Sequence, residues 1–365
     1  MRKNKELRFG RVSLRCGVSA RQLKSKIRSR PDTVRKLMST QKMKVAARDA
    51  MVAVMDLVAS DHVLVVTDNV KKKIGESFAE AARGVGCATE IHVLEEESRP
   101  LVEIPDVMAE ALDRVSVVIN MFDARSEEVP FRVKWMIAIS GTGRIRCGHG
   151  PGITEEMMLG AMCVDFAALR AASERLISRF ADAATVHITA PAGTNLVMDI
   201  AGRGFCHDSH ITVEAAGNLP CGEIYCAPVE TGASGLLVID GSIGDAGSVT
   251  EPVHITISDG RITGIQCRDD TLLRRMEEVT SIDAEAAVVG ELGIGLNPGA
   301  KISGCMLEDE KAFQTAHIAF GNNTEMPGGK NRSTTHRDFL FHRPTMVVTS
   351  RDGRQRTVLK DGDIK

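Results

Sequence analysis

Two side chains near the C-terminus, His336 and Asp338, could supply an imidazole nitrogen and a carboxylate oxygen to one metal ion. They stand two positions apart in Ser333-Thr-Thr-His-Arg-Asp338, and residues i and i+2 of a strand point to the same face of a sheet. Gly328 and Gly329 precede them and would let the backbone approach the ion closely. Taken alone, the spacing is also compatible with a surface pair.

Three more side chains of these chemical types interrupt apolar stretches in the same half of the chain. Glu291 lies between residues 286–290 and 292–296, which are predicted to be buried, and a lone buried carboxylate is costly unless it is paired or binds a metal. Glu223 interrupts an apolar stretch in the same way, whereas His317 could equally be a core histidine with a backbone partner. Together the five residues predict a site for Zn²⁺, Mn²⁺, Co²⁺ or Fe²⁺, because acids and imidazoles are ligands of these ions.

The elements that must position these residues differ between the two halves of the chain. Residues 44–183 alternate short apolar runs with helical stretches, which predicts a parallel sheet covered by helices. Residues 184–365 hold short β-rich runs separated by Gly and Pro, with a hairpin turn at Asp259-Gly260. The predicted fold class is therefore α/β plus α+β: an N-terminal α/β lobe with a helical connector, and a C-terminal β-rich lobe that holds the metal site.

Composition places the chain among soluble globular proteins large enough for two lobes, with 365 residues of which 43% are hydrophobic. No apolar run predicts a membrane span, and a formal net charge of −2 gives no reason to expect a nucleic acid or a membrane as partner. The scattered cysteines indicate free thiols and a cytoplasmic location. Residues 1–43 are predicted to be a basic, disordered tail, although an organelle-targeting segment is an alternative.

Several motifs in order along the chain resemble the aminopeptidase T-type metallo-aminopeptidases, in particular the shorter branch labelled leucyl aminopeptidase. The resemblance covers nearly all of the chain after about residue 44. The motifs that resemble the family are Asn218-Leu-Pro-Cys-Gly-Glu-Ile-Tyr-Cys-Ala-Pro228, Gly290-Glu-Leu-Gly-Ile-Gly-Leu-Asn-Pro298, Glu308-Asp-Glu-Lys311, His317-Ile-Ala-Phe-Gly321 and Ser333-Thr-Thr-His-Arg-Asp338.

The resemblance implies a homodimeric enzyme with two divalent ions (Zn, Co, Mn or Mg) that removes N-terminal residues from small peptides. Carried over to this sequence, it implies metal ligands at Glu223, Glu291, His317, His336 and Asp338. We hypothesise that Glu291 is also catalytic, as the carboxylate that bridges two ions and their activated water. A further acid, Glu230 or one of residues 308–310, could move a proton or hold the substrate ammonium.

The sequence also departs from the aminopeptidase pattern. These enzymes have a tyrosine seven residues after the histidine of His-Ile-Ala-x-Gly, whereas this chain has Thr324 there and Tyr225 as its only tyrosine. The superfamily is also similar to a ring-cleaving dioxygenase of 2,5-dihydroxypyridine, which uses one Fe(II). That enzyme holds its iron with two histidines and one aspartate, and His317, His336 and Asp338 could supply the same set of ligands. A dioxygenase and a non-catalytic member of the family are therefore alternatives.

A weaker motif, Cys206-His207-x-x-His210, resembles a zinc site, but no second cysteine pair has the spacing of a zinc finger. The first predicted strand ends at Thr67-Asp68 without a glycine-rich turn, so the N-terminal lobe is not expected to bind NAD.

Overall fold

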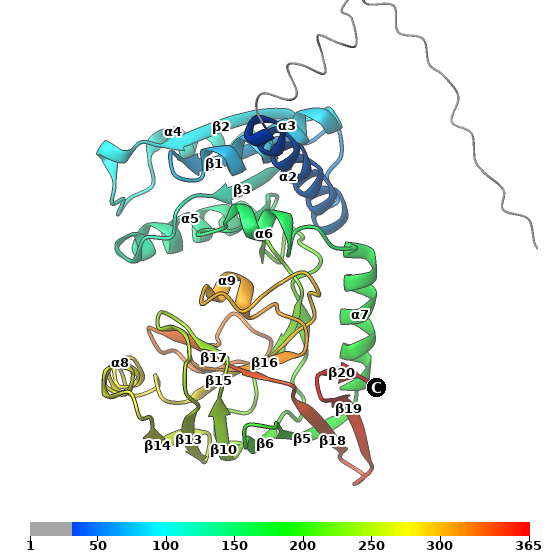
Figure 1. The fold of residues 1–365 in the computed structure, drawn as a ribbon, viewed down its shortest axis with the longest axis vertical. Helices are drawn as coiled ribbons and strands as arrows, with labels where there is room; N and C mark the ends of the chain where they lie inside the picture. Colours follow the sequence, from blue (N-terminus) through cyan, green and yellow to red (C-terminus); the bar gives the residue numbers. More distant parts are fainter. Residues whose placement is uncertain (1–30) are drawn as a thin grey trace, which may run out of the picture. The chain divides into compact units, whose positions relative to one another are not determined.

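The computed structural model describes the backbone of residues 31–365 and side chains from residue 37 onward (Figure 1). Most of the tail predicted for residues 1–43 lies outside the described residues. The first described helix, α2 (Pro31–Met55), begins inside that segment, and the predicted bounds of the tail stay a prediction. Apolar residues at helical spacing are buried in this helix from Met43 to Met55.

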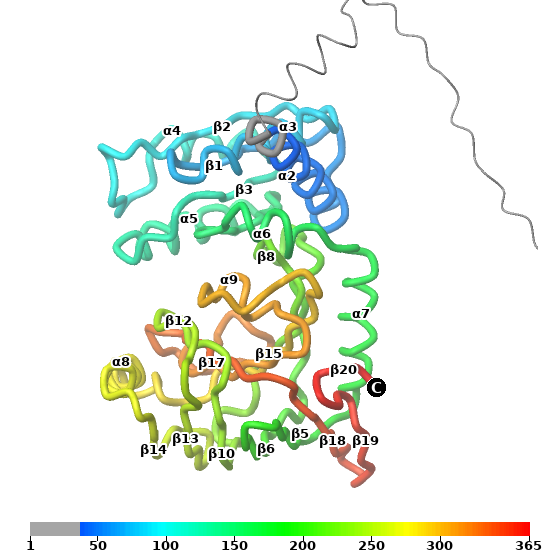
Figure 2. The backbone as a smooth tube through the Cα atoms, in the orientation of Figure 1, coloured from blue at the N-terminus to red at the C-terminus, as the bar shows by residue number. Residues whose placement is uncertain are grey.

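The N-terminal lobe is built on a five-stranded parallel sheet, as the alternating pattern predicted. The strand order is β2-β1-β3-β4-β8, and helices pack against the sheet (Figures 1 and 2). The elements are β1 (His62–Asp68), α3 (Lys72–Val85), β2 (Ala88–Leu94), η1 (Glu96–Ser98), α4 (Asp106–Ala111), β3 (Val117–Met121), η2 (Ser126–Glu128), α5 (Val129–Gly141), β4 (Arg146–His149), α6 (Glu155–Leu159) and α7 (Phe166–Arg179).

Strand β8 (Gly217–Asn218) belongs to this parallel sheet although it follows residue 184 in the chain. It pairs with β4 through Gly148 and His149. From Asn218 only four residues lead to Glu223, so the edge of the parallel sheet lies one short loop away from a predicted metal ligand. We propose that the boundary between the two lobes lies at residues 183 and 184, as the sequence predicted.

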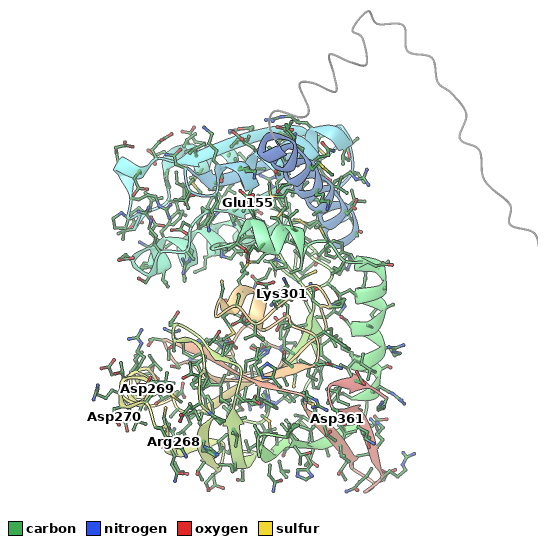
Figure 3. The ribbon with its side chains drawn as sticks, viewed as in Figure 1. Glu155, Arg268, Asp269, Asp270, Lys301 and Asp361 are labelled. Atoms are coloured by element: carbon green, nitrogen blue, oxygen red, sulfur yellow. The ribbon has the colours of Figure 1, made fainter. Side chains whose placement is uncertain are left out.

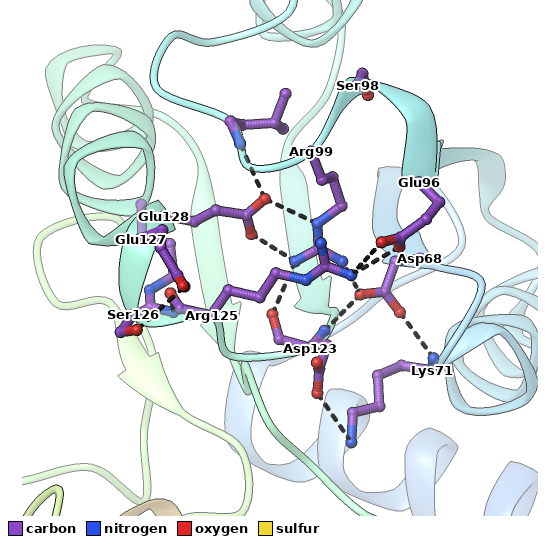
Figure 4. Close-up of polar contacts among 12 residues, drawn as sticks. Asp68, Lys71, Glu96, Ser98, Arg99, Asp123, Arg125, Ser126, Glu127 and Glu128 are labelled. Carbon is purple, nitrogen blue, oxygen red and sulfur yellow. Dashed lines mark hydrogen bonds and ion pairs between the residues drawn. The ribbon is translucent and has the colours of Figure 1, made fainter.

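A closed network of charges lies where the parallel strands end, in the loops that follow β1, β2 and β3 (Figure 4). The guanidinium of Arg99 is fully buried and forms ion pairs with Asp68 and Glu128. It also donates a hydrogen bond to the carbonyl of Asp123, while the N–H of Leu101 donates to Glu128. In the order β2-β1-β3, the chain reverses its direction across the sheet after β2, and parallel sheets usually bind ligands at the carboxyl ends of the strands at such a position. Here the charged side chains around Arg99 occupy that position.

The C-terminal part forms two antiparallel sheets. The eight-stranded sheet contains β5 (Ala183–Thr189), β6 (Asn195–Asp199), β10 (Ala233–Ile239), β13 (Val253–Ser258), β14 (Arg261–Gln266), β18 (Thr345–Ser350), β19 (Gln355–Lys360) and β20 (Asp363–Ile364). The seven-stranded sheet contains β7 (Cys206–His207), β9 (Glu223–Cys226), β11 (Ser242–Ile243), β12 (Gly247–Ser248), β15 (Val289–Gly295), β16 (Thr315–Gly321) and β17 (His336–His342). Helix α8 (Asp270–Thr280) follows the predicted hairpin β13–β14, and its N-cap Asp269 is labelled in Figure 3.

The two faces of the seven-stranded sheet differ in chemistry. One face carries Leu292, Ile294, Ile318 and Phe339, which belong to the same apolar core as the inner residues of the eight-stranded sheet. Because side chains alternate along a strand, the opposite face receives the polar residues of the same strands. Every residue of β15 and β16 is buried, so the polar face is covered as well.

The cover over the polar face is the segment of residues 296–312, which includes α9 (Met306–Asp309) (Figure 1). Lys301, labelled in Figure 3, lies in this segment, and Lys311 reaches from its end into the sheet. Within the described residues, no helix is both long and apolar enough to cross a membrane.

Candidate metal centre

Four neighbouring strands bring the five predicted ligands together on the polar face of the seven-stranded sheet. In the order β17-β16-β15-β9, Asp338 pairs with Ala319, His317 with Gly293, and Gly295 with Glu223. Paired residues share a face, so these side chains project into one space. The structure therefore places the residues that the sequence singled out side by side, although their role as metal ligands stays a proposal.

Strand alternation and one glycine place two of these side chains. Glu291, Gly293 and Gly295 alternate toward the same face of β15, and Glu291 pairs with Ala319, which in turn pairs with Asp338; the β-bulge of β15 lies just before Glu291. A side chain on Gly293 would meet the ring of His317, with 1.9 Å between the added Cβ and Nε2. The glycine therefore provides the space in which the imidazole of His317 lies.

The ligand atoms form two groups that share Glu291. Glu223, Glu291 and His317 form the buried group, and Glu291, His336 and Asp338 form the second group; within each group the ligand atoms all lie within 4.8 Å of one another. Nε2 of His317 lies 3.3 Å from Oε1 of Glu291, and Nε2 of His336 lies 3.2 Å from Oε2 of the same carboxylate. Each oxygen of Glu291 thus faces a different histidine, which is the arrangement expected of a bridging carboxylate.

A backbone contact fixes the orientation of His336. Nδ1 lies 2.7 Å from the carbonyl oxygen of Asn322, which can only accept, so Nδ1 carries a proton and donates it. Nε2 then points toward Glu291 and toward Asp338, whose Oδ1 is 3.4 Å away. Metal-binding histidines are usually oriented in this way.

The donor atoms fit a cation, because one of them has no other partner. Oε2 of Glu223 is buried and receives no hydrogen bond from the described residues. It lies 3.4 Å from Nε2 of His317. A buried carboxylate oxygen without a donor is costly, and a bound divalent ion would remove that cost.

The other oxygen of Glu223 is held by Lys311, which ends the motif Glu308-Asp-Glu-Lys311 and has no role predicted from the sequence. Lys311 is fully buried, and its Nζ lies 2.5 Å from Oε1 of Glu223 and 2.6 Å from Oε1 of Glu310. It also lies 3.4 Å from Oδ2 of Asp208, whose Oδ1 accepts from the N–H groups of Gly222 and Glu223. Fixing Oε1 in this way leaves only Oε2 of Glu223 for the metal centre.

The charges of the site act on the pKa values of its histidines in the metal-free protein. Burial lowers the pKa of His317, but the hydrogen bond to Glu291 and the charges of Glu223 and Asp338 outweigh burial and raise it to about 9. Burial likewise opposes the charge of His336, yet Asp338 and Glu291 raise its pKa well above its usual value. Protons thus occupy positions that a metal would take, so metal binding must release them.

Most of the additional acids suggested by the sequence have structural duties. Glu230 accepts from Arg203, Asn323 and the N–H of Lys330. Glu308 accepts from the N–H of Lys301, and Asp309 accepts from Ser303 and Gly304. These carboxylates already accept hydrogen bonds from the loops beside the site.

The weaker zinc motif does not assemble. Nδ1 of His207 contacts Ser209, and Nε2 of His210 contacts Asp56. Neither histidine belongs to a compact group of metal-binding side chains within the described part of the chain. Thr324, at the family's tyrosine position, is exposed and donates its hydroxyl hydrogen to Asn322.

Comparisons with known proteins point to one family. A sequence model described as thermophilic metalloprotease (M29) matches residues 167–364. The structure of wild-type AmpT from Thermus thermophilus is similar with a TM-score of 0.67 and 17% identity, over 89% of this chain and 99% of that chain. The 2,5-dihydroxypyridine dioxygenase from Pseudomonas putida KT2440 is similar with a TM-score of 0.66 and 17% identity, over 90% of this chain and 96% of that chain. At such identity both likenesses show a shared fold, and no curated protein matches the chain in sequence.

Proposed function

Because this chain belongs to the thermophilic metalloprotease (M29) family, we propose that it is an aminopeptidase that removes N-terminal residues from peptides with a metal-activated water. Membership confirms the family that the motifs predicted, and it makes the protein a metallopeptidase and hence a hydrolase. The observation that supports the proposal most directly is the pair of ligand groups that share Glu291.

The charge of the site supports two divalent ions in place of one. One buried ammonium, that of Lys311, contacts three carboxylates of the site. With ionised acids and neutral imidazoles, four negative charges remain, which two divalent ions would neutralise and one Fe(II) would not. The five carboxylates in this count are those of Asp208, Glu223, Glu291, Glu310 and Asp338.

The residues of the chain have distinct roles in this proposal. Glu223 and His317 would hold one ion, His336 and Asp338 the other, and Glu291 both. When bound, such ions lower the pKa of a water and polarise the scissile carbonyl. The carbonyl of Asn322 keeps Nε2 of His336 available by accepting a hydrogen bond from Nδ1–H, and Lys311 keeps one oxygen of Glu223 away from the centre. Both contacts set the geometry before substrate binds.

The alternative of an Fe(II) dioxygenase requires His317, His336 and Asp338 to bind one ion. Among the described residues these three do not form one compact ligand group; Glu291 separates His317 from the other two. The geometry therefore favours the hydrolase. The aminopeptidases have a tyrosine where this chain has Thr324. If the phenol of that tyrosine assists catalysis, the Thr324→Tyr variant should raise kcat.

Two measurements test the proposal together. Protein purified without oxygen should contain about two Zn, Mn or Co ions per chain, and it should hydrolyse members of a panel of amino-acid p-nitroanilides and dipeptides. As matched controls, Asp338→Asn and Glu223→Gln should each lose one of the two ions. A panel that stays unhydrolysed with every added metal, or a single Fe per chain, would contradict the aminopeptidase.

The metal identity, a homodimer, a cytoplasmic location and the absence of nucleic-acid and membrane partners stay predictions. Size-exclusion chromatography with light scattering would test the homodimer.

A further inference from the structure

Among the described carboxylates near the metal centre, Glu310 accepts hydrogen bonds through only one of its two oxygens. Oε1 of Glu310 is anchored by Lys311 at 2.6 Å and by the side-chain amide of Asn218 at 3.4 Å. No described residue donates a hydrogen bond to Oε2. Glu310 belongs to neither of the two ligand groups found among the described residues.

The surroundings of Glu310 place it between the two lobes and beside both ligand groups. Asn218 comes from β8, the edge strand of the parallel sheet, whereas Lys311 reaches down to Glu223. The charge of Glu310 acts on Glu223 of the buried group, and the charge of Asp338 in the second group acts on Glu310. Its side chain is 13% exposed and therefore not fully closed off from solvent.

An aminopeptidase must recognise the free N-terminus of its substrate close to the reacting carbonyl, since the α-nitrogen is only two bonds from the carbonyl carbon. A carboxylate only accepts hydrogen bonds and is attracted to an ammonium, whereas the neighbouring Glu230, Glu308 and Asp309 are already used. On this basis, and resting on the proposed aminopeptidase function, we propose that Glu310 binds the α-ammonium of the peptide substrate through Oε2.

In this arrangement Lys311 is a positioning residue. It joins Oε1 of Glu310 to Oε1 of Glu223 through one buried ammonium, so the acceptor for the substrate nitrogen is fixed relative to the buried ligand group. The distance between the bound ammonium and the centre then selects substrates with a free α-amino group. Acylated N-termini and chains that lack the amino group would leave the carboxylate unpaired.

The test compares two substrates in the metal-loaded full chain: leucine p-nitroanilide and 4-methylpentanoyl p-nitroanilide, which lacks only the amino group. The wild-type protein should prefer the amino substrate in kcat/KM. Glu310→Gln should reduce that preference by roughly 10- to 150-fold, the value of a hydrogen bond to a charged group. Metal content should stay unchanged, and Glu308→Gln, a buried neighbour whose carboxylate accepts from the N–H of Lys301, should keep the wild-type preference.

The outcomes separate this inference from the proposed function. If the wild type hydrolyses the amino substrate and Glu310→Gln keeps the full preference, Glu310 does not bind the ammonium. If Glu310→Gln slows both substrates equally, the residue acts in the chemical step, and the inference is likewise overturned. A wild type that hydrolyses neither this substrate nor any member of the wider panel overturns the aminopeptidase function itself, and the inference with it.

Discussion

The two lobes each bury a cluster of charges, and the clusters differ in how completely they are satisfied. In the parallel-sheet lobe, Arg99 has Asp68 and Glu128 as partners, and a backbone N–H completes the shell of Glu128 (Figure 4). In the β-rich lobe, the acids around Glu291 outnumber the nearby ammonium of Lys311, and Oε2 of Glu223 has no donor.

This difference distinguishes a structural network from a functional one. A buried cluster whose charges and donors balance can serve the fold without any ligand. A cluster with excess acids and an unpartnered buried oxygen is incomplete as protein alone, and completion by cations is the simplest solution. Variants that change one cluster at a time should therefore affect stability in the first case and activity in the second.

Glu291→Gln should have the largest effect on function. The variant removes the carboxylate shared by both ligand groups, so both ions should be lost and kcat/KM should fall at least about a thousandfold, as when one member of a catalytic unit is removed. Metal analysis and p-nitroanilide hydrolysis measure both quantities. Retention of two ions per chain would contradict the bridging role.

Arg99→Met should mainly affect stability. It leaves Asp68 and Glu128 buried without their cationic partner, which is expected to cost about 3–5 kcal/mol of the free energy of unfolding. The folded fraction should keep its metal content and its kcat, measured after denaturant titration has defined that fraction. Arg125→Met, which removes the more exposed pair with Glu96, is the matched control and should cost less. Loss of metal in Arg99→Met would show that the clusters are coupled.

Gly293→Ala should have an intermediate effect, confined to the buried ligand group. The added Cβ would occupy the position of the His317 ring, so the imidazole must move and the geometry of that group is disturbed. We expect kcat/KM to fall about 10- to 100-fold. Gly264→Ala, on β14 where an added Cβ meets only Thr256 at 4.0 Å, is the control and should keep the wild-type rate.

The smallest effect concerns pH. Burial raises the pKa of Glu128, but the hydrogen bonds from Arg99 and the Leu101 N–H outweigh burial and lower it. The resulting stabilisation is complete above the unfolded value of about 4.3 and is lost as pH falls through the lower folded value. Urea titrations between pH 6 and pH 3 should therefore show the stability difference between wild type and Arg99→Met shrinking as pH falls toward the lowered folded pKa of Glu128. A constant difference would argue against this pair.

The sequence alone determined the alternation of strands and helices in the first half, the β-rich second half and the identity of the five candidate ligands. Periodicity and the cost of a buried charge depend on local residue order, which explains why Glu291 and the His336–Asp338 spacing were informative without a structure. Helix α2 begins at Pro31, whereas its buried apolar residues begin at Met43, so apolar periodicity alone does not indicate where this helix begins.

Only the tertiary structure decided how the candidate ligands are divided and what surrounds them. Strand register sets Gly293 against His317 and brings Glu291 between two histidines, so that each of its oxygens faces a different one. The burial of Lys311 and the availability of Glu310 depend on a loop folding over strands that lie far away in sequence. Such contacts cannot be read from residue order, because a lysine in a polar run is ordinarily a solvated side chain.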